Sequence, residues 1–408
     1  MKKLLALSLA LLLTTACGGN AVPVPEPAPI TAPPTTTVPT TTAPTTTATP
    51  ATVPTTTMPA TEAPPEPTLP DATQRYADIR YIAWRPDRVK KPVYEAGEFN
   101  PEFIHTFTFN DSVILQGSEA LQAAVLEAGK NPGLGVRSLH AQGITGAGVN
   151  VAIIDGTLLL DHPEYAGRIA AYFNNSGEPD TAGSTHGAAV TSALAGETTG
   201  TAPGVRVYYA AASASPPDAR NYADCLYWII EENAKLPEGE KIRVVSVSAD
   251  PADQESDYIN QKEWDVAVLA AQQAGILVLD CGQAFKPNHI FSAFYDLEDP
   301  EDPAKCTVGY PEHPRRMDGK YINAPASLRT FAEQYTEGEY GYQYWGEGGR
   351  SWAVPYVAGI FALGWQVNPE LTGGQLRVLL YNTAATGTNG GNIVDPVAFI
   401  AAVQATLE

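Results

Sequence analysis

Three residues that lie far apart in the sequence, Asp155, His186 and Ser351, have the side chains that together can turn a serine hydroxyl into a nucleophile. A serine hydroxyl is a weak nucleophile until a base takes its proton, and an imidazole can be that base near neutral pH. A carboxylate behind the imidazole fixes its tautomer and stabilises its protonated form. Because Asp, His, Ser is one of the chain orders in which this constellation occurs, we consider these residues candidate catalytic groups.

The residues around each candidate predict the element that positions it. Residues 149–154 are rich in Val and Ile, which is typical of a buried strand with Asp155 at its C-terminal end. Small and apolar residues follow both His186 and Ser351, and they predict two buried helices that begin there. Pro355 is expected in the first turn of the second helix, where proline is tolerated. The N-terminal end of that helix would then face charge that develops at Ser351.

Strand-like runs alternate with helix-like stretches from residue 149 onward. The strand-like runs are residues 149–154, 205–211, 244–247 and 276–279, and the helix-like stretches are residues 187–194, 221–234, 264–274, 352–365 and 374–381. This alternation predicts an α/β domain in which helices cover both faces of a parallel sheet. Catalytic residues are expected at the carboxyl ends of its strands.

These segments resemble the sequence motifs of the subtilase (subtilisin-like serine protease) family. The aspartate motif is similar to residues 151–156, continued by residues 161–163, the histidine motif is similar to residues 186–190, and the serine motif is similar to residues 349–359. Shorter similarities occur in order at residues 136–146, 201–205, 308–311 and 324–325, so the resemblance covers about residues 134–408.

The resemblance implies an α/β, subtilisin-like three-layer fold with a mainly parallel central sheet and helices on both faces. It also implies a serine endopeptidase that hydrolyses peptide or protein substrates through an acyl-enzyme, with Asp155, His186 and Ser351 as its triad. No cofactor and no metal is expected, because the sequence has neither a Cys-x-x-Cys nor a His-Glu-x-x-His spacing.

Three residues near the predicted nucleophile and oxyanion hole depart from the family's usual pattern. Arg350 stands where the family usually has threonine and Trp352 where it usually has methionine, and these bulky side chains are expected to alter or occlude the pocket. Gln283 stands where the family has the asparagine of the oxyanion hole, and it offers the same amide donor on a longer arm, beside the backbone N–H of Ser351. These departures leave a second hypothesis open: a catalytically weak or inactive protein of this fold that binds peptides or cell-envelope partners.

By the same resemblance, Ser248, Ala249 and Asp250 would line the first specificity pocket, where the end of a strand pairs with the substrate backbone. Asp250 replaces a residue that is normally small and neutral in the family. We therefore expect a preference for a basic side chain at the matching position of the substrate.

The sequence of residues 1–71 predicts that the protein is exported and attached to a membrane. Residues 1–16 combine two lysines with an apolar run that is too short to span a bilayer, which indicates a signal peptide. Cys17 follows Thr-Thr-Ala and resembles the lipidated cysteine of a bacterial lipoprotein, and an ordinary cleaved secretory signal is the alternative. Residues 17–71, rich in Thr and Pro, are expected to form a disordered tether. We thus expect an extracytoplasmic protein, lipid-anchored to the cell membrane within the bacterial envelope.

Residues 72–133 precede the predicted catalytic domain, residues 134–408, and have two interpretations. They form either an inhibitory propeptide, which many members of the family carry, or a permanent N-terminal extension. Cleavage after a propeptide would separate the lipid tether from the enzyme. We therefore favour the uncleaved extension slightly.

The charge of the chain argues against one class of partner, nucleic acids. The formal net charge is −20, from 45 acidic and 25 basic residues. No basic run could bind a row of phosphates, so a nucleic-acid partner is not expected.

Apart from Cys17 the sequence has three cysteines. Cys281 and Cys306 are the favoured disulfide pair, with free buried cysteines as the alternative.

Overall fold

The computed structural model describes residues 67–408 except residues 83–84, 86, 253–255, 283–288 and 316–318. The predicted signal peptide, most of the predicted tether, Cys17 and Gln283 lie outside the described residues. All described elements belong to one structural unit, residues 62–408. Within this part of the chain, no helix is both long enough and apolar enough to cross a membrane.

Five parallel strands form the central sheet, in the order β5-β6-β4-β7-β8. They are β4 (Asn150–Asp155), β5 (Ile169–Asn175), β6 (Arg206–Ala212), β7 (Ile242–Val247) and β8 (Leu277–Asp280). The middle strand, β4, is buried at every residue. Its run of Val, Ala and Ile suits this place because both faces of the strand meet apolar layers.

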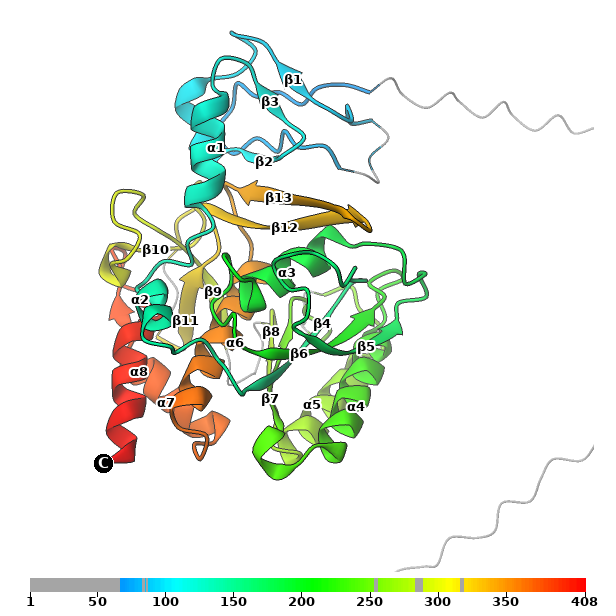
Figure 1. Cartoon of the computed structure of the whole chain (residues 1–408), viewed down its shortest axis with the longest axis vertical. Coiled ribbons are helices and arrows are strands. Elements are labelled where there is room, and N and C mark those ends of the chain that lie inside the picture. The colour runs from blue at the N-terminus through cyan, green and yellow to red at the C-terminus, as the bar shows by residue number, and fades with distance from the viewer. Residues whose placement is uncertain (1–66, 83–84, 86, 253–255, 283–288, 316–318) are drawn as a thin grey trace, which may run out of the picture. The chain divides into compact units, whose positions relative to one another are not determined.

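The side chains of β4 alternate between two hydrophobic cores. Val151 and Ile153 belong to a core that includes α3 (Thr185–Ala195) and α6 (Arg350–Val367). Ala152 and Ile154 belong to a second core, with α4 (Ala219–Lys235) and α5 (Gln261–Gln273). Helices therefore cover both faces of the sheet, and the predicted three-layer α/β arrangement is confirmed (Figure 1).

All the strands and helices predicted from residue 149 onward are present, with boundaries within three residues of the expected ones. One detail was wrong. Because α6 begins at Arg350, Pro355 is its sixth residue and lies inside the helix rather than in its first turn.

Three further sheets in the described residues were not predicted, and the smallest is a parallel pair of β1 (Val93–Tyr94) and β3 (Ile114–Leu115). A mixed sheet has the order β10-β9-β11-β15-β14, with β9 (His289–Phe294), β10 (Thr307–Val308), β11 (Tyr321–Pro325), β14 (Ala385–Thr386) and β15 (Asn392–Ile393). An antiparallel sheet has the order β12-β13-β2, with β2 (Thr108–Asn110), β12 (Arg329–Thr336) and β13 (Glu339–Trp345). In Figure 1 the strands β12 and β13 lie between α3 and the N-terminal elements.

The remaining elements are short. Before residue 134 they are β1 (Val93–Tyr94), η1 (Pro101–Thr106), β3 (Ile114–Leu115) and α1 (Glu119–Ala128). After it they are α2 (Val136–Ala141), η2 (Glu238–Glu240), η3 (Pro303–Lys305), α7 (Gly373–Asn382), α8 (Pro396–Gln404) and η4 (Ala405–Leu407).

The favoured disulfide between Cys281 and Cys306 was wrong. Cys225, Cys281 and Cys306 are all free and buried. Cys281 and Cys306 pack within the hydrophobic core of α3 and α6 as small apolar side chains. Burial raises the pKa of both thiols, which favours the protonated form.

Candidate active site

Asp155 and His186 form the polar centre of the site. Asp155 is the last residue of β4 and only 5% exposed, and its Oδ1 lies 2.8 Å from Nδ1 of His186. The same Oδ1 accepts the backbone N–H of Gly156 at 2.8 Å. Because a carboxylate only accepts, Nδ1 of His186 carries the proton, and Nε2 is left free to act as a base.

The environment of His186 favours its protonated form. Burial favours the neutral imidazole, but the charge and the hydrogen bond of Asp155 outweigh it and raise the pKa of His186 above its usual value. The side chain still has 42% of its surface exposed, so a substrate can reach it. This arrangement stabilises an imidazolium without removing it from solvent.

A glycine allows α3 to begin close to the end of β4. A Cβ at Gly187 would lie 2.6 Å from Oη of Tyr209 and 2.7 Å from the carbonyl oxygen of Thr157. Helix α3 is capped by Ser184, whose hydroxyl accepts the N–H of Gly187 at 3.2 Å. The His-Gly pair seen in the sequence therefore has a packing reason: only glycine fits directly after the imidazole.

Ser351 is the second residue of α6, and it exchanges two hydrogen bonds with Ser248. Its Oγ donates to the carbonyl of Ser248 at 3.4 Å, and Oγ of Ser248 donates to the carbonyl of Ser351 at 2.8 Å. The second bond depends on Pro355, four residues further on. Proline has no N–H to offer the Ser351 carbonyl within the helix, so that carbonyl is open to Ser248.

The helices that carry His186 and Ser351 pack against each other. Trp352, which follows the serine, has its ring centroid 5.0 Å from that of His186. Among the described residues, the hydroxyl of Ser351 bonds to Ser248 and not to His186. The structure thus joins Asp155 to His186 and sets Ser351 at the start of the neighbouring helix. Hydrogen bonds between nucleophile and base are often long or misaligned before substrate binds.

Trp352, one of the two bulky residues beside the predicted nucleophile, is buried among aromatic rings. It is only 3% exposed, and its ring lies 5.0 Å from that of Phe331 and 5.1 Å from that of Trp345, in addition to His186. The indole is therefore part of the core beneath the imidazole. Its ring is tilted by 38° to that of His186 and packs against it.

Arg350 contacts two predicted site segments. It donates from Nη1 to the carbonyl of Cys281, two residues before Gln283, and its Nη2 lies 3.9 Å from Oδ2 of Asp250. Asp250 follows β7 together with Ser248 and Ala249. The predicted acidic pocket residue therefore already has a cation beside it. Ala249 in turn accepts the N–H of Cys281 at 2.9 Å.

Two residues near the site were missed in the sequence analysis, Arg80 and Gln343. Arg80 is 9% exposed and donates to Oε1 of Gln343, whose Nε2 donates to the carbonyl of Thr185 at 3.3 Å. Neither Arg80 nor Gln343 belongs to a recognisable sequence motif. Arg80 lies more than a hundred positions before His186, so sequence spacing gives no signal of their proximity.

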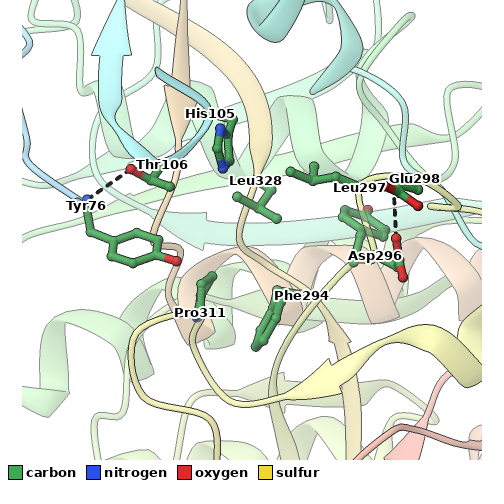
Figure 2. A pocket seen from close by; sticks show the side chains of 10 residues that line it. Tyr76, His105, Thr106, Phe294, Asp296, Leu297, Glu298, Pro311 and Leu328 are labelled. Carbon is green, nitrogen blue, oxygen red and sulfur yellow. Dashed lines mark hydrogen bonds between the residues drawn. The ribbon is translucent and has the colours of Figure 1, made fainter. Parts of the chain in front are cut away.

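A cavity of about 400 Å³ lies apart from these residues. Figure 2 shows Tyr76, His105 and Thr106 on one side of it and Phe294, Pro311 and Leu328 among its other lining residues. Asp155, His186 and Ser351 are not among the residues that line it. It is therefore not part of the candidate active site.

The chain is similar in sequence to known proteases. The model described as the Subtilase family matches residues 146–282, which include Asp155 and His186 and end before Ser351. The chain is 26% identical over 298 residues to the subtilisin-like protease PopC of Myxococcus xanthus (strain DK1622). That alignment covers 61% of this chain and 58% of PopC, so the chain spans less than two thirds of this relative's length.

Solved structures show the same fold. A protease from Pseudoalteromonas arctica PAMC 21717 aligns with a TM-score of 0.50 and 19% identity, over 67% of this chain and 95% of that one. Fervidolysin from Fervidobacterium pennivorans, a keratinolytic enzyme related to subtilisin, aligns with a TM-score of 0.50 and 17% identity, over 68% of this chain and 45% of that one. The chain therefore has a subtilisin-like α/β fold, and its residues 146–282 match the model of the Subtilase family.

Proposed function

We propose that this chain is a serine endopeptidase with Ser351 as nucleophile, His186 as general base and acid, and Asp155 as the residue that orients His186. The observation that carries the proposal is the 2.8 Å hydrogen bond between Asp155 and Nδ1 of His186 at the carboxyl end of β4. It fixes the tautomer in which Nε2 is a base. Helix α6, whose second residue is Ser351, packs against α3, and Trp352 in its first turn contacts the ring of His186.

In the proposed reaction, Oγ of Ser351 leaves the carbonyl of Ser248 and turns toward Nε2 of His186. That hydrogen bond is long, 3.4 Å, so its loss costs little. The hydroxyl then attacks the peptide carbonyl as its proton passes to His186, and the imidazolium returns a proton to the leaving amine. A water molecule, activated by His186 in the same way, hydrolyses the acyl-enzyme.

The oxyanion of the tetrahedral intermediate would be held at the N-terminus of α6. The first N–H groups of a helix have no partner within the helix, so the N–H of Ser351 is suited to donate to it. Gln283 is proposed as the second donor, and it follows the segment that Arg350 holds through the carbonyl of Cys281.

For the substrate, we propose a peptide or protein whose backbone runs past Ser248, Ala249 and Asp250. The predicted preference for a basic side chain depends on Asp250, which faces Arg350 at 3.9 Å. A substrate cation must therefore compete with Arg350. We expect the preference to be modest in the native protein.

A second candidate function is peptide binding without cleavage. It is favoured by one observation, the hydrogen bond from Ser351 to Ser248 in place of one to His186. The two functions are separated by incubating the wild-type protein and S351A with a peptide library and analysing the products by mass spectrometry. Cleavage by the wild type alone supports the endopeptidase. An intact library bound equally by both proteins would support the binding protein.

The proposal places the protein outside the cytoplasm, lipid-anchored to the cell membrane through Cys17. Its support is the sequence of residues 1–71, with its short apolar run, its cysteine and its tether. Expression with a labelled fatty acid tests it. Label in the wild type that is lost in C17A is the expected result, and equal label in both proteins would contradict it.

A further inference from the structure

The N-terminal segment, residues 72–133, is joined to the strands of the domain that follows it. Strand β2 pairs with β13 in antiparallel register, with Phe109 opposite Tyr344. On the other side of β2, the N–H of Ile79 donates to the carbonyl of Thr108 at 2.9 Å. The segment thus supplies two strand-like pieces to a sheet whose other strands follow α3 in the sequence.

The junction reaches the loop before the predicted nucleophile. The N–H of Gly346 donates to the carbonyl of Phe107 at 3.0 Å, and a Cβ at Gly346 would collide with the carbonyl of Thr106. Gly346 lies five positions before Ser351. The backbone that leads into α6 is therefore fixed against the N-terminal segment.

The segment also contributes to the main hydrophobic core. Ile79, Phe107 and Phe109 are each at most 1% exposed and share one core with Trp352. Burial of such apolar side chains is a main source of the stability of a folded domain. A segment that was released on maturation would leave this surface open to water.

Arg80 connects the segment to His186 by two routes. The first is polar: Nη1 of Arg80 donates to Gln343, and Gln343 donates to the carbonyl of Thr185, the residue before His186. The second is aromatic: the guanidinium lies 4.2 Å from the ring centroid of Trp345, which packs on Trp352. Trp352 in turn packs on His186.

The guanidinium is itself held in place. Its Nε donates to both carboxylate oxygens of Asp78, at 3.1 and 3.2 Å. Its charge also acts on His186, where it opposes protonation while the charge of Asp155 favours it. The planar fork of arginine can bind Asp78, donate to Gln343 and stack on Trp345 at once, which lysine cannot do.

We infer that residues 72–133 remain a permanent part of the active protein and that Arg80 is a positioning residue for His186. The inference rests on the proposed function, because it assigns a role in the same catalytic site. It excludes an inhibitory propeptide that is released as the enzyme matures.

The test compares R80Q, R80K and R85Q with the wild type. Arg85 is the matched control, since it lies in the same segment and pairs with Asp87 at an exposed site. Two readouts are measured: the rate of labelling by a fluorophosphonate as a function of pH, and the titration of His186 by NMR of protein with labelled histidine. The melting temperature of each variant shows that it is folded.

We expect R80Q to react roughly ten- to a hundredfold more slowly, since small displacements of a catalytic group have effects of this size. Its His186 titration and the acid limb of its rate profile should move to higher pH, because a cation near the imidazole has been removed. R80K should keep the wild-type titration and recover part of the rate, and R85Q should match the wild type. A folded R80Q with the wild-type rate and titration would overturn the inference.

The permanence of the segment is tested by the intact mass of the labelled protein. We expect every labelled molecule to contain residues 72–133. A labelled species that begins after residue 133 and reacts at the full rate would overturn the inference. If the wild type is not labelled at all, the proposed function fails, whereas the NMR titration of His186 in R80Q still decides whether Arg80 acts on it.

Discussion

Glu333 provides a quantitative test of how the N-terminal segment joins the rest of the protein. It lies on β12 and is 6% exposed, and its carboxylate accepts hydrogen bonds from Nδ2 of Asn110 at 2.7 Å and from Oη of Tyr335 at 3.1 Å. Burial raises the pKa of Glu333 from 4.5 to about 7, although the nearby Arg80 opposes the change. The group should therefore keep its proton in the folded protein at pH values where the unfolded chain has lost it.

The sign and size of the effect follow from proton linkage. Between pH 4.5 and about 7 the folded state binds the proton more tightly than the unfolded state, so stability falls as pH rises through this window. At 1.36 kcal/mol per pKa unit, the loss is on the order of 3 kcal/mol. Below pH 4.5 the full stability is present, and above about pH 7 the loss is complete.

The perturbation is E333Q, which keeps a hydrogen-bonding side chain of the same size without the titration. The free energy of unfolding is measured by urea denaturation from pH 4 to pH 8 for the wild type, E333Q and a control, E339Q, at an exposed position of the adjacent strand. The free-energy difference between E333Q and the wild type should grow by on the order of 3 kcal/mol across the window. The difference for E339Q should stay flat. A constant difference for E333Q as well would show that Glu333 is already ionised in the folded protein, and would refute the reasoning.

The remaining predictions concern the site. D155N should lower the rate of peptide hydrolysis by about 10⁴, because the hydrogen bond that fixes the His186 tautomer is replaced, and steady-state kinetics that show less than a tenfold loss would contradict it. The hydrolysis rate of the wild type should fall as pH drops through the raised pKa of His186, since the base must be neutral; a pH–rate profile that is flat through the acid range would argue against His186 as the base. G187A should lose about 1–3 kcal/mol of stability in urea, because the added Cβ would lie 2.6 Å from Tyr209 Oη, whereas a melting curve like that of the wild type would be inconsistent with this packing. R350A should raise the ratio of kcat/KM for substrates with a basic side chain over neutral ones, since Asp250 loses its internal cation, and an unchanged ratio would show that Asp250 does not line the pocket.

The central sheet could be predicted because its strands are apolar on both faces. In β4 both sets of alternating residues enter a hydrophobic core, so the residues from Val151 to Ile154 are apolar without interruption. The antiparallel sheet β12-β13-β2 has no such continuous apolar strand. In β13 the residues toward Glu339 are exposed, whereas Gln343 and Tyr344 are buried. The polar side chain of Gln343 can be buried because it donates a hydrogen bond to the carbonyl of Thr185.

The candidate triad residues could be found because their neighbours are constrained by packing. Gly187 must be small beside Tyr209 and Thr157, and such a constraint leaves a recognisable local pattern. The roles of Arg350 and Trp352 could not be predicted in the same way. Their contacts, Asp250 for the one and Phe331 with Trp345 for the other, come from segments distant in the sequence.

Arg80 and the cysteines also make contacts that come from distant segments. Arg80 reaches the site only because β2 joins β13, a pairing between strands separated by more than two hundred residues. Cys281 and Cys306 were paired because both follow the strand predicted at residues 276–279, whereas each thiol is free and packed among apolar side chains. Such contacts form only in the tertiary structure, so the spacing of residues along the chain does not predict them.

The central claim is that Ser351 is a nucleophile activated by His186, and a fluorophosphonate tests it most directly. The wild-type protein, S351A and H186A are treated with the probe, and the modified residue is located by peptide mapping. The account predicts one adduct per molecule, on Ser351, absent from S351A and formed far more slowly in H186A. A wild-type protein that stays unmodified, or an adduct on another residue that persists in S351A, would contradict it.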